Sequence, residues 1–408
     1  MARLACTTAL QDRMREAYRE VIEAASDPGQ RVAWCSSVGP VELLRALGFR
    51  VFIPENHAAM LGASRMATDL IPEATALGYS PDICSYLTSD IGAFCRGVTA
   101  LSRVDPSFRE VPRPDVLVHE SQQCREVGDW FQWYGDRLGV PVLGVPAPRA
   151  VEEVTPDLVQ ALASRIEALV EPLEAIAGRS LDLARLRDVV AISRETSRRW
   201  QQVLAMGEVR PAPWTFFDAC IQMGPAVVLR GDRRALAHYD LLQEELRHRV
   251  MAGVAAVPEE QVRLYWEGMP IWGRLRDLSE RLASLRAAVV GSTYCSSWVF
   301  EALDPDRPFE SMAQAGLELF ISRTDPVKER ILEEEARRYS VSGIVFHDAK
   351  TCPYNSNSRF GMPRRLTRDR GIPTVTIQSD LNDLRLHFDE GVHLALEAFV
   401  EQCREAMP

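Results

Sequence analysis

Short apolar runs alternate with amphipathic helical segments in two separate parts of the chain. Each part contains four strand-like runs, namely RVAWC, RVFIP, DVLVH and VPVLGV in residues 30–150 and VRLYW, AAVVGS, GIVFH and PTVTIQ in residues 257–408. Strands that alternate with helices predict a parallel sheet covered on both faces. We therefore expect an α/β fold with two flavodoxin-like or Rossmann-like parallel-sheet domains.

The remaining segments have a helical pattern. Residues 151–256 carry apolar positions at a period of about 3.6 residues and few strand signals. Residues 8–26 have an amphipathic pattern that ends at Asp27-Pro28-Gly29. The predicted organisation is an N-terminal helix (1–29), a first α/β domain (30–150), a helical region that serves as a lid or subunit contact (151–256) and a second α/β domain (257–408).

Two pairs of similar segments suggest that the halves arose by duplication. VLVHESQQC, residues 116–124, and GIVFHDAKTC, residues 343–352, both pass from an apolar strand through a histidine and an acid to a cysteine. VAWCSS, residues 32–37, and VVGSTYCSS, residues 289–297, both end in Cys-Ser-Ser. Common strand-to-loop chemistry is the alternative explanation for these matches.

Three cysteines stand beside predicted strand ends or helix starts: Cys84, Cys124 and Cys352. The carboxyl ends of parallel strands open onto a shared cleft, where helix N-termini stabilise thiolates. Three thiolates could hold an iron–sulfur cluster that leaves one iron open to substrate. The spacing is too wide for a compact metal motif, and free cysteines often serve as small buried apolar residues.

The other six of the nine cysteines have plainer interpretations. Cys35 and Cys295, in the Cys-Ser-Ser segments, could supply further ligands or line the pocket, although packing is the simpler role. We expect structural roles for the remaining four, Cys6, Cys95, Cys220 and Cys403.

Polar side chains also follow the first two strands. Ser37, Glu55 and His57 should face the same cleft, where they could bind a carbonyl group or move a proton. The alternatives are that Ser37 caps a helix and that Glu55 is solvated. His119 and His347 could orient the cysteine loops, but an isolated histidine more often has a structural role.

Charge and motifs exclude several classes of function. With 57 acidic and 47 basic residues the net charge is −10, so nucleic acid is not an expected partner. No apolar run reaches the ~20 residues of a membrane span, and the first residues lack the apolar core of a signal peptide. A cytoplasmic protein with reduced thiols is therefore expected. The P-loop, the dinucleotide fingerprint after a first strand and the nucleophile elbow of hydrolases are missing from the sequence.

Four segments together carry a resemblance to a known family. PENHAA, GYSPDICSYLTSDIGAF, HDAKTCPYNSN and GIPTVTIQSDLNDLR, in this order, resemble the benzoyl-CoA reductase and 2-hydroxyacyl-CoA dehydratase family. The likeness extends from about residue 30 to residue 404. It implies two α/β domains with helical additions and a [4Fe–4S] cluster on three cysteines, matched here by Cys84, Cys124 and Cys352. It also implies substrate contacts from a serine and a glutamate, matched by Ser37 and Glu55.

The resemblance implies radical chemistry on an acyl-CoA. A separate ATP-hydrolysing iron–sulfur activator protein delivers single electrons to the cluster, and the thioester carbonyl then becomes a ketyl-type radical anion. In the dehydratases this radical expels the hydroxyl group as water, whereas in benzoyl-CoA reductases it leads to dearomatisation of the ring. Members work as pairs of related subunits, so a second catalytic subunit or a homodimer is expected.

Four functional hypotheses follow. The segments ICSYLTSDIGAF and QSDLNDLR look closer to benzoyl-CoA reductase, so the first hypothesis is the cluster-bearing subunit of an ATP-dependent, low-potential acyl-CoA reductase. The second is a 2-hydroxyacyl-CoA dehydratase component, which is a lyase with the same cluster. The third is a reductase of small molecules with a double-cubane cluster, for which Cys35 and Cys295 could supply ligands. The fourth is a non-catalytic scaffold subunit.

Overall fold

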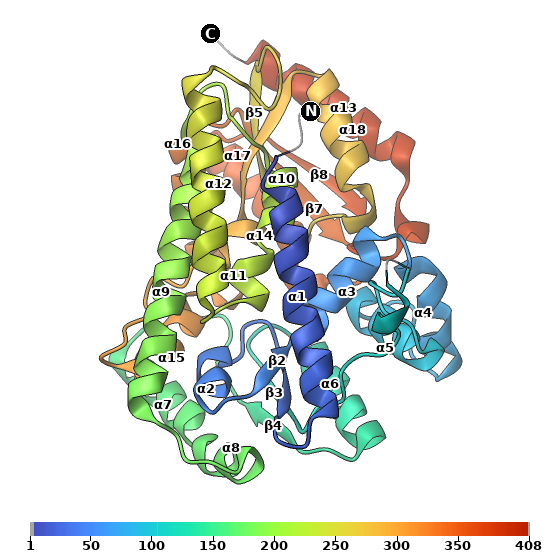
Figure 1. The fold of residues 1–408 in the computed structure, drawn as a ribbon. Helices are drawn as coiled ribbons and strands as arrows, with labels where there is room; N and C mark the ends of the chain where they lie inside the picture. The colour runs from blue at the N-terminus through green and yellow to red at the C-terminus, as the bar shows by residue number, and fades with distance from the viewer. Residues whose placement is uncertain (1–3, 104, 407–408) are drawn as a thin grey trace.

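Two four-stranded parallel sheets form the centre of the fold (Figure 1). The computed structural model describes residues 4–103 and 105–406, so the first three residues of the predicted segment 1–29 lie outside the described part. In spatial order, the first sheet contains β2 (Arg50–Phe52), β1 (Val32–Cys35), β3 (Val116–Glu120) and β4 (Val142–Val145). The second contains β6 (Ala287–Ser292), β5 (Val262–Glu267), β7 (Gly343–Ala349) and β8 (Thr374–Ser379). The predicted α/β class with two parallel sheets is confirmed.

The two sheets have the same topology. β1 lies between β2 and β3, and β5 lies between β6 and β7 in the same way. β7 is therefore the equivalent of β3. In both His-acid-Cys segments the histidine and the acid lie at the end of the strand, and the cysteine follows it. β6, however, is the equivalent of β2 and not of β1, so the two Cys-Ser-Ser segments follow strands that are not equivalent. The duplication hypothesis is wrong for that second pair, whose likeness reflects the small polar residues that often follow buried strands.

The central strands are apolar because both of their faces are buried. All four residues of β1 are buried, and Trp34 pairs in register with Phe52 of β2 and Leu117 of β3. The Trp34 ring also packs edge-on against Tyr134 of α6, with ring centroids 4.7 Å apart. Continuous burial of this kind is typical of parallel strands between helical layers. The shared strand direction brings the loops after β1 and β3 to one edge of the sheet.

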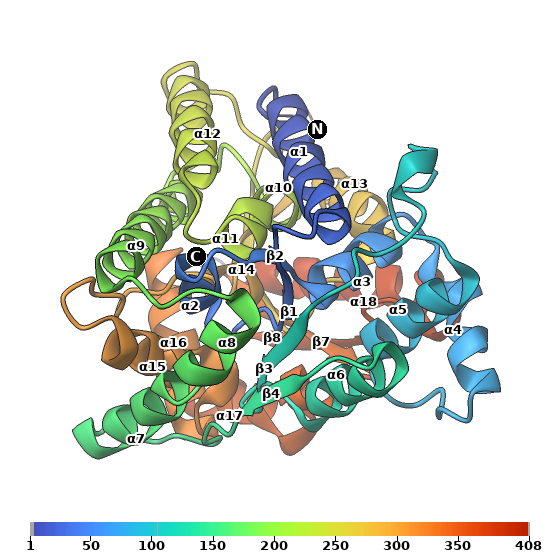
Figure 2. The same ribbon diagram turned by 60° about the horizontal axis from the view of Figure 1, so that its bottom comes forward.

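Helices cover both sheets. The first sheet and its surroundings include α1 (Thr7–Ser26), α2 (Val41–Ala46), α3 (Pro54–Ala63), α4 (Ala67–Ala76), α5 (Ser85–Arg96) and α6 (Arg125–Leu138). The second sheet is accompanied by α13 (Leu275–Ser284), α14 (Thr293–Ser296), α15 (Pro308–Glu318), α16 (Asp325–Arg338), α17 (Met362–Arg370) and α18 (Asp389–Glu405). Figure 2 shows α2 and α6 on opposite sides of the first sheet.

The middle of the chain is helical, as its periodicity indicates. It contains α7 (Pro156–Glu167), α8 (Val170–Ala177), α9 (Leu183–Ala205), α10 (Phe216–Gln222), α11 (Gly224–Val228) and α12 (Arg233–Met251). The long helices α9 and α12 lie side by side in Figure 1, α9 also packs against α2, and α7 packs against α15. The helical region thus contacts both halves, and one continuous apolar cluster includes both Trp34 and Trp266. The domain boundaries themselves stay predictions.

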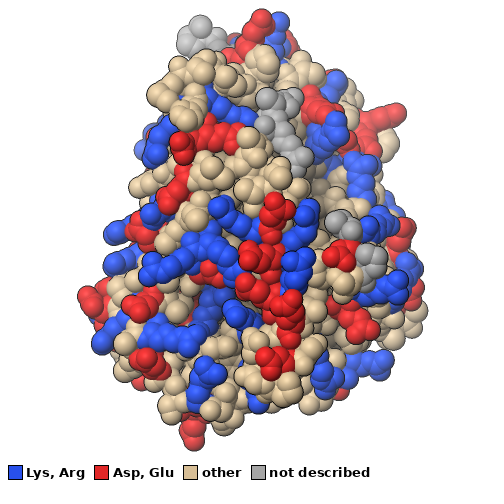
Figure 3. Space-filling view, in the orientation of Figure 1, with Lys and Arg blue, Asp and Glu red and all other residues tan. Residues whose placement is uncertain are grey.

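Helix α1 crosses the front of the molecule in Figure 1 and packs on β2 and α12. Its buried residues Leu10, Ala17, Val21 and Ala24 form one apolar face, and its opposite face is charged. Figure 3 shows acidic and basic side chains side by side over the central helices of this face. In the described part of the chain, no helix has the length and apolar character that a membrane span requires.

Candidate functional site

The loops after the sheet strands meet at a cavity of about 460 Å³, here called the main cavity. Ser37 after β1, Cys124 after β3 and Cys352 after β7 all line it. Residues of α1, α3, α5, α6, α10, α11 and α14 also contribute to its wall. Because its lining comes from both halves and from the helical region, the cavity depends on the packing of the whole chain.

The three predicted cluster cysteines come together at the main cavity. Cys84, Cys124 and Cys352 all line its wall. Cys84 is the residue before α5, Cys124 the residue before α6, and Cys352 the residue before the short helix η5 (Pro353–Asn355). The thiol of Cys124 is close enough to those of Cys84 and Cys352 for both neighbours to raise its pKa. Side chains far apart in the sequence thus form one group of sulfur atoms.

Burial opposes ionisation of these thiols in the absence of metal. It raises the pKa of Cys84 to about 12, and it also raises the pKa values of Cys124 and Cys352. No capping hydrogen bond is formed by the Cys84 side chain, yet the nearby backbone N–H groups of Leu87 and Tyr86 lower its pKa. Backbone N–H groups of Val127 and Asn355 act in the same direction on Cys124 and Cys352. Helix N-termini therefore favour the thiolate form that a metal requires.

The donor set fits an iron–sulfur cluster better than a single ion. Among the residues that the structure describes, no group of three His, Cys, Asp or Glu side chains is arranged to hold one metal ion. In a cubane cluster each thiolate binds a different iron, so its protein ligands stand further apart than those of one ion. Three soft sulfur donors beside helix N-termini, on the wall of a cavity with room for substrate, suit a [4Fe–4S] cluster.

The other cysteines are placed differently. Cys35 and Cys295 are buried, and neither is among the described residues that line the main cavity. Cys220 is buried in the apolar core, as its surroundings in the sequence indicated, and it also lines this cavity and contacts the thiol of Cys295. Cys95 lies exposed on α5.

One carboxylate connects the loops of Cys84 and Cys352. Asp380, which is fully buried, accepts hydrogen bonds from Ser85 Oγ at 2.5 Å and from Thr351 Oγ1 at 2.6 Å. The backbone N–H of Ser85 donates to Thr351 Oγ1 at 3.0 Å. The segment QSDLNDLR contributed to the family resemblance, but nothing in it indicated that Asp380 would fix both cysteine loops. The aspartate was detectable only as a polar residue directly after a strand.

Ser37 and Glu55 form a pair on the wall of the main cavity. The backbone N–H and the hydroxyl of Ser37 donate to Glu55 Oε1 at 2.9 and 3.1 Å. Glu55 is only 8% exposed, and burial raises its pKa to about 7 despite these hydrogen bonds. Neither a capping role for Ser37 nor a solvated Glu55 agrees with this geometry. The carboxyl group is poised to exchange a proton near neutral pH.

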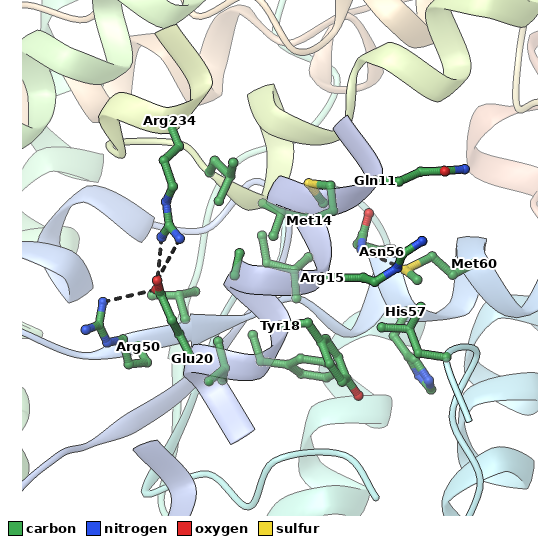
Figure 4. A pocket seen from close by; sticks show the side chains of 18 of the residues that line it. Gln11, Met14, Arg15, Tyr18, Glu20, Arg50, Asn56, His57, Met60 and Arg234 are labelled. Carbon is green, nitrogen blue, oxygen red and sulfur yellow. Dashed lines mark hydrogen bonds and ion pairs between the residues drawn. The ribbon is translucent and has the colours of Figure 1, made fainter. Parts of the chain in front are cut away.

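His57 does not join this pair. It lines a neighbouring cavity of about 280 Å³ beneath α1, here called the side cavity, which Figure 4 shows. Its Nε2 accepts a hydrogen bond from the backbone N–H of Ala100, so the proton is on Nδ1, which donates to Asp90 at 2.5 Å. Asp90 also accepts from Trp130 and Tyr134. Both ring nitrogens are thus engaged, and the arrangement is that of a structural histidine.

The two histidines near the cysteine loops also lie outside the lining of the main cavity in the described chain. His347 Nδ1 bonds to the carbonyl oxygen of Met269 at 2.5 Å, and burial lowers the pKa of this ring to about 4. His119 packs against Phe131. Both positions favour the structural interpretation that the sequence left open.

A buried ion pair between Arg230 and Glu42 holds the loop that carries Ser37. Arg230 pairs with Glu42, with Nε 2.9 Å from Oε1, and donates from Nη1 to the carbonyl oxygen of Ser37 at 3.1 Å. Glu120 lies near both charges and is 3% exposed, with Oε2 unpartnered among the described residues. Burial is the main cause that raises the pKa of Glu120 to about 8. The nearby Arg230 guanidinium lowers this pKa, and the nearby Glu42 carboxylate raises it further. Glu120 therefore stays largely protonated at neutral pH.

This protonation makes stability depend on pH. Between the ordinary pKa of a glutamate and the raised pKa of Glu120, the folded protein retains a proton that the unfolded chain releases. Stability therefore falls as pH rises through this interval, by at most about 1.4 kcal/mol per pH unit for one group. We expect Glu120→Gln to reduce the change in the free energy of unfolding with pH, measured by urea unfolding between pH 5.5 and 7.5. An unchanged slope would contradict the protonated state, and Glu110→Gln, at an exposed position, is the control.

Comparisons with known proteins extend over almost the whole chain. The family model described as 2-hydroxyglutaryl-CoA dehydratase, D-component, matches residues 36–403. The chain is 26% identical to the (R)-phenyllactyl-CoA dehydratase alpha subunit of Clostridium sporogenes, with 88% of this chain and 86% of that protein covered. It is 26% identical to the lactoyl-CoA dehydratase subunit alpha of Anaerotignum propionicum (93% and 92%). It is 25% identical to a benzoyl-CoA reductase subunit of Thauera aromatica (86% and 83%).

Proposed function

Because the chain belongs to the 2-hydroxyglutaryl-CoA dehydratase D-component family, we propose that it is the [4Fe–4S]-bearing catalytic subunit of an enzyme that acts on acyl-CoA thioesters. The relatives that define this family relationship are named as acyl-CoA dehydratase and benzoyl-CoA reductase subunits. The observation that carries the proposal is the meeting of Cys84, Cys124 and Cys352 with Ser37 and Glu55 at one cavity.

The three cysteines would hold the cluster, which when bound supplies single electrons at low potential to the thioester. The relatives are each named as one subunit of an enzyme, which indicates enzymes with more than one subunit. We therefore include in the proposal a related second subunit or a second copy of this chain. A separate ATP-hydrolysing iron–sulfur activator protein as the electron donor completes it.

Glu55 is the residue that we assign to proton transfer. Its Oε1 is occupied by two donors from Ser37, so the proton of the neutral carboxyl group is on Oε2. From this oxygen it can pass to the hydroxyl oxygen of a 2-hydroxyacyl group as the carbon–oxygen bond breaks, which releases water and leaves Glu55 as a carboxylate. When the double bond forms, the acyl chain releases a proton, which replaces the one that Glu55 gave to the leaving hydroxyl group. The overall reaction is loss of water, with no net oxidation or reduction.

Reduction of an aromatic acyl-CoA is the second candidate. Aromatic side chains are prominent in the wall of the main cavity, and they are Tyr86, Trp130, Trp272, Tyr294, Trp298 and Tyr354. Such a wall suits a planar ring, and the relationship to a subunit of benzoyl-CoA reductase points the same way. The sequence favoured this reaction, whereas the dehydratase relatives and the polar pair Ser37–Glu55 favour dehydration as the first reaction to test.

A parallel assay separates these reactions. The anaerobically purified chain, with its partner subunit and an activator from a related system, is given ATP, a low-potential reductant and either phenyllactyl-CoA or benzoyl-CoA. The proposal predicts loss of water from the first ester, and the second candidate predicts gain of hydrogen by the second. Conversion of neither ester by cluster-loaded protein would contradict the catalytic assignment for these acyl groups and favour the scaffold hypothesis.

A further inference from the structure

Gln123 extends the Ser37–Glu55 pair along the wall of the main cavity. Its Nε2 lies 3.1 Å from Ser37 Oγ, and its side chain lines the main cavity between Ser37 and Cys124. Its Oε1 is buried and has no hydrogen-bond partner among the described residues. Glu55 Oε2, at the other end of the same hydrogen-bonded chain, is also buried without a partner in the described structure. Both ends of the chain thus lack the hydrogen-bond partner that a buried polar atom needs.

The hydrogen bonds fix the direction of the Gln123 amide. The Ser37 hydroxyl has a single hydrogen, which it donates to Glu55 Oε1, so Ser37 Oγ is an acceptor toward Gln123. Only the amide nitrogen of Gln123 can donate to it, and the carbonyl Oε1 must be the other end. A buried carbonyl oxygen left without a donor destabilises the protein, so a ligand that supplies a donor is favoured.

A hydroxyl group carries both the donor and the acceptor that these two unpartnered ends lack. It can donate its hydrogen to Gln123 Oε1 and accept the Glu55 Oε2 proton on its oxygen. The last torsion of a glutamine side chain is soft, so the amide can turn toward a ligand at little cost. The acyl part of a benzoyl thioester has no hydrogen-bond donor, whereas a 2-hydroxyacyl thioester has one next to its carbonyl group.

We propose that Gln123 is a specificity-determining residue that recognises the 2-hydroxyl group of the substrate, with Oε1 accepting the hydroxyl hydrogen while Glu55 contacts the hydroxyl oxygen. The inference rests on the proposed function, since it requires an acyl-CoA in the main cavity. Gln123 should affect the binding only of substrates that carry the 2-hydroxyl group.

Equilibrium binding without activator, ATP or reductant tests the inference, because no turnover then occurs. The two ligands are phenyllactyl-CoA and 3-phenylpropanoyl-CoA, which lacks only the hydroxyl group. We expect the cluster-loaded wild-type protein, with its partner subunit, to bind the hydroxylated ester about tenfold more tightly. In Gln123→Met, of similar size but without polar ends, this preference should fall well below tenfold, to what the Glu55 contact alone supplies, while affinity for 3-phenylpropanoyl-CoA and iron content stay unchanged.

Two further variants make the result specific. Gln132→Met changes an exposed glutamine on α6, whose side chain bonds to Asp136, and should leave the preference intact. Gln123→Asn keeps the amide group but has a side chain shorter by one methylene group, so it should weaken the preference for the hydroxylated ester. It replaces Gln123→Met in the test if that variant does not fold. A purely structural role for Gln123 would change the affinities for both esters together.

The outcomes separate the inference from the proposed function. Wild-type protein that binds neither ester would overturn the proposed function for these acyl groups, and the inference with it. Wild-type protein that binds both esters equally would overturn the inference alone. A tenfold preference that persists in both Gln123→Met and Gln123→Asn, or affinities that fall equally for the two esters, would also overturn it.

Discussion

Replacing Cys124 with alanine is expected to remove the cluster and abolish activity, with bound iron falling from about four atoms per chain to less than one. Cys124 lies close to both of the other cysteines and is the residue directly before α6. Without it, one iron would face a buried wall with no thiolate in that position. Iron and acid-labile sulfide, measured on protein purified without oxygen, give the result directly.

Cys95→Ala is the matched control for this variant. Cys95 lies on α5, the helix that follows Cys84, but its side chain is exposed. The control should keep both iron and activity. Unchanged iron content in Cys124→Ala would show that this cysteine is not a cluster ligand.

Glu55→Gln is expected to lower the rate about 10²- to 10³-fold while iron content stays constant. The amide keeps the shape of the side chain and can retain the hydrogen bonds to Ser37, but it cannot give up a proton. Steady-state rates at saturating acyl-CoA measure the loss. Glu73→Gln, which changes a partly exposed glutamate paired with Arg96 on the surface, should have no comparable effect.

The assignment of Glu55 as the acid also predicts how the reaction rate changes with pH. Glu55 is proposed to act as the protonated acid, and burial raises its pKa to about 7, so we expect the wild-type rate to fall as pH rises above that value. Below it the acid form is already present, and this group causes no further change. The alkaline fall should be missing in Glu55→Gln. A full rate in this variant, or an alkaline fall that persists in it, would exclude Glu55 as the acid.

The sheets and the meeting of the cysteines were predictable because both follow from local pattern. Apolar runs such as that of β1 mark strands buried on both faces, and parallel strands bring their carboxyl ends to one edge. Cys124 and Cys352 follow equivalent strands of two separate sheets, so their convergence also required the carboxyl ends of the two sheets to face the same cavity. Cys84 stands at a helix start, which the sequence also indicated.

The partners of individual polar side chains were not predictable. His57 looked like a member of the Ser37–Glu55 group because it follows the same strand as Glu55. Two residues along an α-helix, however, rotate the side chain by about 200°, which turns His57 away from Glu55 and toward Asp90. Gln123 was passed over because glutamine next to a cysteine has no motif, and its role depends on a contact with Ser37, 86 positions earlier. Asp380 likewise acts through contacts with residues remote in sequence. Such contacts depend on how the loops pack, which periodicity does not specify.

The most direct test of the central claim is the iron and acid-labile sulfide content of the wild-type chain, purified without oxygen and studied by EPR after reduction. A single [4Fe–4S] cluster on Cys84, Cys124 and Cys352 predicts about four irons and about four sulfides per chain, with the EPR signal of a reduced cluster. Protein that contains neither iron nor sulfide, although kept strictly from oxygen, would contradict the account.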